Sequence, residues 1–358
     1  MKLIIFGLTI SSSWGNGHAT LWRGLCGALA ARGHHPIFFE KDVPYYAATR
    51  DLTDIAGGKL VLYQDWQDIR DTAANELADT DVAIVTSYCP DSLLATELLQ
   101  ERSGALRVFY DLDTPVTLAV LQTANRVAYL GDNGLRDFDL VLSYTGGEAL
   151  TQLRTVLGAR SVAPLYGSVD PHAHHPVEPS SAYRASLYYL GTYAEDRQQT
   201  LEQLFVEPAR RLTDEQFLLG GSLFPQTFPW TLNMNYIYHV PPPEHPAFYC
   251  SSRINLNVTR GAMARMGYCP SGRLFEAAAC GTPIVSDYWE GLDHFFTPGT
   301  EILVARNTQD VMEYLSRDST ELQQIGRAAR QRALSEHTAE RRALELEQVL
   351  QSAGAEIV

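Results

Sequence analysis

The sequence has little cysteine and still less lysine, and each shortage excludes a class of protein. Its five cysteines are widely spaced and include no C-x-x-C pair, so neither a disulfide framework nor a zinc knuckle is expected. We interpret them as buried thiols of a cytoplasmic protein. The only lysines are Lys2, Lys41 and Lys59, so nearly all of the 28 basic residues are arginine, a bias typical of GC-rich bacterial genomes. A phosphate site would therefore use arginine side chains or backbone amides.

Long apolar runs and an excess of positive charge are lacking as well. No stretch approaches the ~20 apolar residues that a membrane-spanning helix needs, so no integral membrane segment is expected. The opening MKLIIFGLTI is short and no small-residue cleavage site follows it, which predicts a first strand rather than a signal peptide. The net charge is −14, whereas proteins that bind nucleic acid usually present a basic surface. We therefore expect no nucleic-acid partner.

The remaining composition is that of an ordinary globular protein with room for two cores. The chain has 358 residues, of which 45% are hydrophobic, and this length favours two domains. Short apolar runs alternate with amphipathic stretches throughout, which predicts an α/β fold with parallel sheets. A segment rich in proline and histidine, residues 166–181, interrupts the alternation. It predicts an interdomain linker whose histidines are exposed.

These patterns predict an N-terminal domain at 1–168, a C-terminal domain at 169–337 and a final helix at 338–358. Strands are expected at 3–8, 35–39, 60–63, 82–86, 106–110 and 140–143 in the first half, and at 186–190, 217–219, 235–240, 254–258, 283–285 and 302–304 in the second. Helices are expected at 18–32, 92–101, 148–157, 197–212, 246–251, 273–280 and 308–316, followed by a helical tail at 319–351.

A loop rich in small residues, SSSWGNGH, follows the first predicted strand. Gly15 and Gly17 allow the backbone to approach a ligand, and the helix that begins at His18 directs free N–H groups toward it. Trp14 lies in the same loop. The loop is not a full G-x-G-x-x-G, so a nicotinamide cofactor is only weakly supported and none is expected. The alternative is a simple tight turn with a solvated His18.

A pair of aspartates follows the strand at 106–110, in the motif FYDLDTP. Asp111 and Asp113 are two residues apart, so in an extended backbone their side chains point the same way. One of them can serve as a general base or orient His18. Asp113 equally suits the N-cap of a helix that begins near Pro115, and both roles remain open. For acceptor activation we favour His18 as the proton acceptor and Asp113 as a positioning group.

A second group of polar residues lies in the second half of the chain. Ser271 and Gly272 precede a predicted helix, whose N-terminal amides together with Arg273 suit a diphosphate. Arg260 lies in the loop before them, and Arg197 follows another strand closely enough to reach a phosphate. The segment predicts an anion site built without a metal.

Glu276 lies one turn inside this helix. Its neighbours from Phe275 to Cys280 are apolar or small, and a carboxylate in such surroundings is costly unless it has a partner. Two vicinal hydroxyl groups, as on a ribose, would be suitable partners. The alternative is an ordinary surface position on the helix.

The run GRLFEAAACGTPIVSDYWEGLDHFFTPGTEILVARNTQD resembles the C-terminal signature of family 4 glycosyltransferases. Together with YLGTYAEDRQ, PPPEHPAFYCSSRINLNVTR, SSWGNGHATLWRGL and FFEKDVPYY, it is most similar to the branch of spore-maturation CgeB-like glycosyltransferases. The resemblance covers most of the chain. It implies the GT-B fold, with two Rossmann-like domains facing a central cleft and a C-terminal helix crossing back to the first domain. It also implies transfer of a sugar from a nucleotide diphosphate sugar to an acceptor bound by the first domain, without a metal.

The resemblance also implies roles for individual residues. Glu276 would bind the ribose, while Gly191, Thr192 and the 270–272 turn would face the donor diphosphate. The turn containing Gly291 and Leu292 would lie near the donor sugar. Tyr268 stands where family 4 enzymes have the first glutamate of an E-x7-E motif, which leaves the donor and the choice between retention and inversion open. A GT-B epimerase or phosphorylase, or a non-catalytic nucleotide-sugar or carbohydrate-binding protein, remains the alternative.

Overall fold

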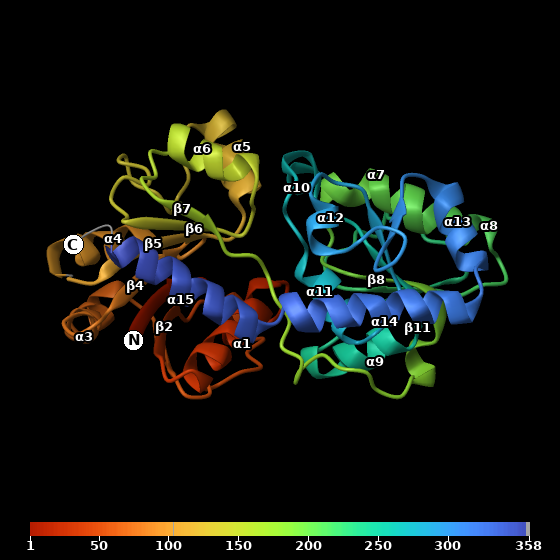
Figure 1. The fold of residues 1–358 in the computed structure, drawn as a ribbon, viewed down its shortest axis with the longest axis horizontal. Coiled ribbons are helices and arrows are strands. Elements are labelled where there is room, and N and C mark those ends of the chain that lie inside the picture. Colours follow the sequence, from red (N-terminus) through yellow and green to blue (C-terminus); the bar gives the residue numbers. More distant parts are fainter. Residues whose placement is uncertain (103, 356–358) are drawn as a thin grey trace. The chain divides into compact units, whose positions relative to one another are not determined.

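A computed structural model describes residues 1–102 and 104–355. The chain forms two compact units. The first contains Met1–Tyr166 together with the residues from Ala339 onward, and the second is Gly167–Thr338. Each unit is a parallel sheet covered by helices (Figure 1).

The first unit is built on a seven-stranded sheet with the order β3-β2-β1-β4-β5-β6-β7, and all of its strand pairs are parallel. Its strands are β1 (Lys2–Gly7), β2 (His35–Lys41), β3 (Lys59–Tyr63), β4 (Val82–Thr86), β5 (Leu106–Asp111), β6 (Leu140–Ser143) and β7 (Val162–Pro164). The central strands are apolar and buried on both faces, as expected for a parallel sheet covered by helices.

The helices of the first unit are α1 (His18–Ala31), α2 (Pro44–Ala47), α3 (Trp66–Leu77), α4 (Ser92–Arg102), α5 (Thr114–Ala124), α6 (Glu148–Thr155) and, from the end of the chain, α15 (Ala339–Ala355). Helices such as α1 and α3 bury an apolar face, whereas the short α2 buries none of its residues. Leu346 and Leu350 of α15 join Leu25 and Leu29 of α1 in one core cluster. The C-terminal helix therefore completes the first unit, as expected.

The second unit is built on a six-stranded parallel sheet with the order β10-β9-β8-β11-β12-β13. Its strands are β8 (Ala185–Leu190), β9 (Phe217–Gly220), β10 (Met234–Ile237), β11 (Ser252–Asn257), β12 (Ile284–Asp287) and β13 (Leu303–Ala305). Its α-helices are α7 (Gln198–Leu201), α8 (Glu207–Arg211), α9 (His245–Cys250), α10 (Gly261–Met266), α11 (Gly272–Ala279), α12 (Leu292–Phe295), α13 (Thr308–Ser316) and α14 (Ser319–Glu336). The expected α/β class with two Rossmann-like domains is confirmed.

Two expected helices are interrupted for identifiable reasons. The helix expected at 197–212 contains a π-helical turn, Glu202–Val206, just before Pro208, which has no N–H and cannot continue the regular hydrogen-bond ladder. The helical tail breaks between α14 and α15 at His337. There the buried imidazole contacts the carbonyl of Phe295 at 3.1 Å and packs against the Phe275 ring. Strand β7 was not expected, because its three residues carry almost no pattern.

The predicted linker begins at the boundary between the two units, and from Gly167 onward it packs within the second unit. Val169 pairs with Thr338, and the backbone N–H of Ser180 donates to the Ser251 hydroxyl at 2.7 Å. His172 and His175 are exposed as expected, but His174 is buried, with 5% of its surface exposed. Its burial depends on packing against α9, which the local sequence does not reveal.

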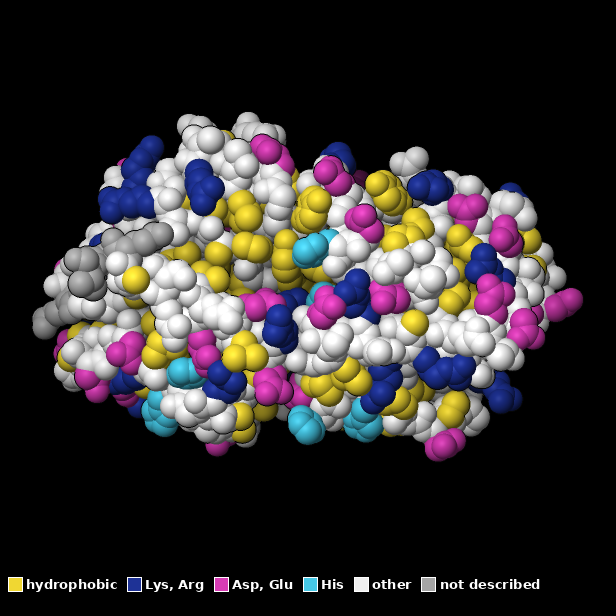
Figure 2. Space-filling view, in the orientation of Figure 1, with side chains coloured by type: hydrophobic (Ala, Val, Ile, Leu, Met, Phe, Trp, Pro, Cys, Tyr) yellow, Lys and Arg dark blue, Asp and Glu magenta, His cyan; other side chains and the backbone are white. Residues whose placement is uncertain are grey.

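The cysteines and the surface agree with the composition. None of the five cysteines, all of which the structure describes, forms a disulfide bond, and four of them are buried. Within the described residues, no helix is both long and apolar enough to span a membrane. On the face shown in Figure 2, acidic side chains lie among the basic ones rather than leaving a uniformly basic area.

Candidate functional site

Each sheet has a switch point at which successive strands begin to add in the opposite direction. Ligands of open parallel sheets bind beyond the carboxyl ends of the strands at such points. In the second unit the switch point lies between β8 and β11, and in the first unit it lies between β1 and β4. The loops that follow these strands contain most of the predicted site residues.

Three arginines of the second unit influence one another at its switch point. Burial lowers the pKa of Arg197, and the neighbouring charges of Arg273 and Arg260 lower it further. Arg197 donates to the carbonyl of Thr192 at 3.0 Å, and its buried Nε has no hydrogen-bond partner among the residues described. Asp196 contacts Arg260 at 3.3 Å. Clustered guanidinium groups of this kind favour a bound anion such as a diphosphate.

Close backbone approach explains the glycines of this loop. A Cβ atom on Gly191 would lie 2.5 Å from a guanidinium nitrogen of Arg273, so a side chain there would displace the arginine. Arg273 donates to Asn257 Oδ1 at 2.9 Å and lies over the ring of Tyr189, 5.0 Å from its centroid. Gly221 has φ +133°, and a Cβ there would collide with the Gly191 carbonyl.

The first turn of α11 places Ser271 and Gly272 next to Arg273. Ser271 is the N-cap residue, and its hydroxyl makes no capping hydrogen bond. The positive end of the helix dipole therefore coincides with the arginine cluster, which strengthens an anion site at this point. Arg265 of α10 is exposed.

Glu276 is half-buried on the next turn of α11. The hydroxyl of Tyr249 donates to its Oε2 atom at 2.9 Å. Burial opposes ionisation of this carboxyl, but the electrostatic influence of His174 and His245, with the Tyr249 hydrogen bond, outweighs it and holds the pKa of Glu276 below its ordinary value. The carboxylate is therefore charged at neutral pH and able to accept hydrogen bonds.

The turn after β12 packs against Tyr268. Gly291 has φ +86°, and a Cβ there would overlap the Tyr268 ring at 2.5 Å. The backbone N–H of Tyr268 donates to the Glu290 carbonyl at 2.7 Å. Leu292 is buried in the core, so it can approach a ligand only through its backbone. The roles of Gly291 and Leu292 at the donor sugar stay predictions.

In the first unit, the structure brings together two of the residues expected to activate an acceptor. His18 Nε2 lies 3.8 Å from Asp113 Oδ1, and both side chains remain partly exposed. Asp113 is the N-cap residue of α5, yet its carboxylate makes no capping hydrogen bond. Tyr88 follows β4 and has a left-handed backbone with φ +66°, and burial together with the nearby charge of Asp113 raises its pKa. Strained positions of this kind cluster at functional sites.

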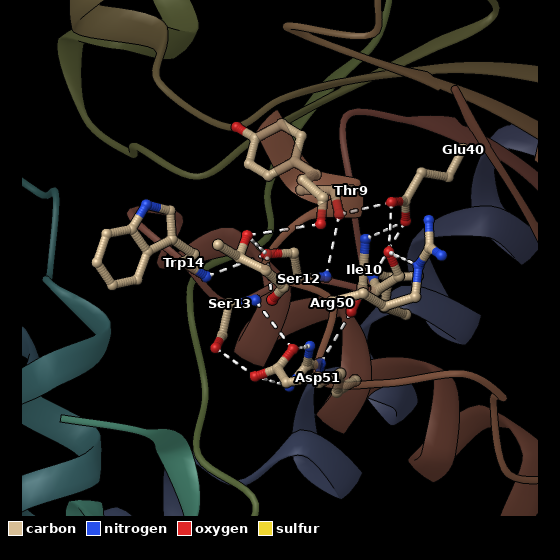
Figure 3. A network of polar contacts seen from close by, with 12 residues as sticks. Thr9, Ile10, Ser12, Ser13, Trp14, Glu40, Arg50 and Asp51 are labelled. Carbon is tan, nitrogen blue, oxygen red and sulfur yellow. Dashed lines mark hydrogen bonds and ion pairs between the residues drawn. The ribbon is translucent and has the colours of Figure 1, made fainter. Parts of the chain in front are cut away.

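A buried carboxylate organises the loop after β1 (Figure 3). Glu40 of β2 is fully buried and accepts hydrogen bonds from Thr9 Oγ1 (2.8 Å), from the backbone N–H of Ile10 (2.8 Å) and Ser11 (3.0 Å), and from Ser11 Oγ (2.6 Å). Farther along, Ser13 bonds to Asp51. These bonds fix the start of the loop that leads to His18.

The other expected loop residues lie beyond this network. In Figure 3 the indole of Trp14 points away from Glu40, and the side chain is half-buried. Gly15, with φ +60°, and Gly17 are exposed. The Asn16 side chain accepts the backbone N–H of His18, the first residue of α1, at 3.0 Å. Contact of Trp14, Gly15 and Gly17 with an acceptor stays a prediction.

Asp111 is fully buried beneath Asp113. Its Oδ1 atom accepts from Thr117 Oγ1 at 2.9 Å and from the N–H of Asp113 at 3.3 Å. Its buried Oδ2 atom has no partner in the part of the chain that the structure describes. Burial raises the pKa of Asp111 to about 6, and the nearby charge of Asp113 also raises it.

The raised pKa of Asp111 predicts a pH-dependent loss of stability. The unfolded carboxyl ionises near pH 4 and the folded one near pH 6, so stability falls as the pH rises between these values. Asp111→Asn removes this ionisation while keeping the accepting oxygen. Between pH 4 and 7 the variant should gain about 2 kcal/mol relative to the natural protein, measured by urea unfolding. Asp71→Asn, at an exposed position of α3, is the control, and equal pH profiles for Asp111→Asn and the natural protein would contradict the expectation.

Several residues of these sites were missed from the sequence. Glu40 ends an apolar run and is followed by Lys41 and Asp42, so it carries only a weaker form of the signal that marked Glu276. Asn257 and Asp287 end β11 and β12, where Asp287 accepts from the N–H of Thr259 at 2.9 Å, and burial raises the pKa of Asp287 to about 6. No local pattern distinguishes Tyr88.

Comparisons with known proteins agree with this architecture. Residues 197–348 match a family model described as glycosyl transferase-like. The fold is similar to that of sucrose-phosphate synthase from Thermosynechococcus elongatus, with a TM-score of 0.70 and 16% identity over 99% of this chain and 100% of the other. No protein with a curated description matches the sequence.

Two further solved structures have the same fold. Anabaena HepE in complex with UDP-glucose aligns with a TM-score of 0.67 and 11% identity, covering 98% of this chain and 100% of the other. An α-glucosyltransferase in complex with UDP-glucose and DNA aligns with a TM-score of 0.72 and 12% identity, covering 98% and 99%. The chain therefore has the fold of these glycosyltransferase structures, two Rossmann-like domains of the GT-B type, and its residues 197–348 are similar to a glycosyl transferase-like family.

Proposed function

We propose that this protein is a cytoplasmic glycosyltransferase of the family 4 type, closest to the CgeB-like branch, that transfers a sugar from a nucleotide diphosphate sugar to an acceptor. The observation that carries the proposal is the group of Arg197, Arg260 and Arg273 at the switch point of the second sheet, with Glu276 one turn along α11. An anion site beside an ionised carboxylate matches the diphosphate and ribose of such a donor.

The chemistry of sugar transfer requires stabilisation of the departing diphosphate. Arginine side chains and the N-terminus of α11 supply positive charge in fixed positions, which lowers the barrier without a metal or another cofactor. The first unit would bind the acceptor, and His18 would take the proton of its nucleophilic group while Asp113 positions it.

The structural neighbours suggest the first donor to test. HepE and the α-glucosyltransferase are both described in complex with UDP-glucose, so we propose a UDP-sugar as the donor. One of these structures also contains DNA. The net charge of −14 argues against a nucleic-acid acceptor for this chain.

The purified protein should release free nucleoside diphosphate from at least one member of a panel of UDP-, GDP- and ADP-sugars. Release should persist in excess EDTA, because the arginine cluster rather than a metal neutralises the leaving group. The measurement is a coupled assay for free nucleoside diphosphate, with Arg273→Met as the inactive control.

Other outcomes of this assay separate the alternatives. Tight donor binding with no release from any donor would indicate a non-catalytic binding protein. Formation of an isomerised nucleotide sugar, or of a sugar phosphate in the presence of phosphate, would indicate an epimerase or a phosphorylase. Loss of turnover in EDTA with rescue by Mg²⁺ or Mn²⁺ would contradict the proposed metal independence.

Replacing His18 with glutamine should lower kcat on the order of 10²-fold, the usual contribution of a general base, while the Kd for the donor stays unchanged. Asp113→Asn should lower kcat by a smaller factor, because the residue positions rather than accepts the proton. Initial rates at saturating donor measure kcat, and calorimetry measures donor affinity.

His35→Gln, at an exposed position of β2, provides a matched control for His18. Near-normal kcat in folded His18 and Asp113 variants would show that the reacting groups lie elsewhere. The stereochemistry of the product, read by NMR, completes the test. In an inverting reaction a base on the acceptor side is needed, whereas in a retaining one the departing phosphate can take the proton.

A further inference from the structure

Three side chains that could bind a metal ion lie together in the second unit, and two of them are histidines to which no role has been assigned above. His174 precedes the sheet, His245 begins α9 and Glu276 lies on α11, and one ligand atom from each lies within 4.8 Å of the others. The rings of His174 and His245 are 5.7 Å apart between centroids. The three side chains come from segments far apart in the sequence, so only the fold brings them together.

The hydrogen bonding of His245 prepares one of its nitrogens for a ligand. Nε2 lies 3.1 Å from the carbonyl oxygen of Val240, which can only accept, so Nε2 carries the proton. Nδ1 therefore has a lone pair, and it is buried with no partner among the described residues. Histidines that bind metals typically donate their other N–H to a carbonyl in this way.

His174, next to His245, is a second histidine with buried, unpaired ring nitrogens. Only 5% of the surface of His174 is exposed. Neither of its ring nitrogens has a hydrogen-bond partner within the described part of the chain. A buried polar group without a partner costs about 1–3 kcal/mol, so such groups normally have one. Both ring nitrogens of His174 and Nδ1 of His245 thus lack a partner beside the Glu276 carboxylate, which indicates a missing ligand that accepts electron pairs.

We propose that His174, His245 and Glu276 form a binding site for a divalent transition-metal ion, best matched by Zn²⁺. Two neutral imidazoles and one carboxylate are a common donor set for Zn²⁺, which leaves a fourth position for water. Metal–ligand distances of ~2.0–2.2 Å keep ligand atoms at most about 4 Å apart. The three ligand atoms would therefore need to approach one another by only about 1 Å to bind one ion. Because Glu276 is also the proposed ribose ligand, the ion would occupy the nucleotide-free protein.

The direct test measures metal binding to the full chain without nucleotide, since a diphosphate would itself chelate the ion. Zn²⁺ should bind with a stoichiometry of one, measured by competition with a chromophoric chelator. Co²⁺ should give the intense visible absorption of a four-coordinate site. His174→Gln and His245→Gln should each weaken Zn²⁺ binding by at least about 100-fold, because a ligand is lost.

The neighbouring histidines are the matched controls. His172→Gln and His175→Gln change exposed residues of the same segment and should bind Zn²⁺ as the natural protein does. Thermal melting shows whether each variant is folded. If His174→Gln does not fold, the His245→Gln result carries the test. Absence of stoichiometric binding to the natural protein, or unchanged binding in a folded ligand variant, would overturn the proposal and leave the alternative of a protonated His174 paired with Glu276.

Donor binding measured in excess chelator keeps this proposal separate from the proposed function. If UDP-glucose and the other panel donors bind the natural protein but Zn²⁺ does not, only the metal site is refuted. If Zn²⁺ binds with the expected loss in His174→Gln while no donor binds, the metal site stands and the proposed function fails.

Discussion

Replacing Glu276 with alanine is expected to weaken binding of the donor nucleotide by more than 100-fold. A hydrogen bond to a charged group contributes ~1.5–3 kcal/mol, and a ribose offers two vicinal hydroxyls to this carboxylate, so the loss should reach about 3 kcal/mol. The structure adds two reasons. The carboxylate is ionised at neutral pH, and the hydrogen bond that the Tyr249 hydroxyl donates to it fixes its orientation.

The measurement is calorimetric titration of the donor in excess chelator, which removes any contribution from metal. Glu313→Ala, at an exposed position of α13, is the matched control and should bind normally. Tyr249→Phe should have a smaller effect than Glu276→Ala, because it removes an orienting bond rather than a ligand. An unchanged dissociation constant in a folded Glu276→Ala variant would show that Glu276 does not bind the ribose.

Replacing Glu40 with leucine is expected to lower the free energy of unfolding by about 3–5 kcal/mol. The substitution leaves four buried donors without an acceptor, on Thr9, Ile10 and Ser11, and each such donor costs ~1–3 kcal/mol when left unpaired. The leucine recovers part of this cost through apolar burial, so the individual losses do not add in full.

Urea unfolding of the natural protein and the variant measures this effect. Glu97→Leu makes the same chemical change at an exposed position of α4 and should alter stability by less than about 0.5 kcal/mol. Glu40→Gln retains one accepting oxygen and should fall between the two. A Glu40→Leu variant as stable as Glu97→Leu would show that the network of Figure 3 contributes nothing to stability.

Much of the architecture could be predicted because it depends on local patterns. Apolar runs such as 82–86 and 140–143 matched strands β4 and β6 residue for residue. The helix expected at 18–32 matched α1, His18–Ala31, to within one residue. The interrupted helix at 197–212 also has a local cause, because Pro208 lacks the N–H that a regular helix would need.

The candidate sites were predicted only in part. Glu276 was conspicuous because an ionisable group among apolar neighbours is costly unless it has a partner. No nearby residue in the sequence indicates that Tyr249 is one such partner. His174 was expected to be exposed, since prolines and other histidines surround it. The structure buries it beside His245, which lies about 70 residues later in the sequence.

The sequence by itself determined the α/β class, the alternation of strands and helices, and the loops in which ligand-binding residues follow strands. Periodicity and apolar burial set these features within a few residues of chain. Only the tertiary structure decided which side chains meet. The strand order places β8 beside β11 and β1 beside β2, and thereby brings Arg273 to Gly191 and Glu40 to the loop after β1. Such pairings depend on crossovers that span tens of residues, so no local pattern records them.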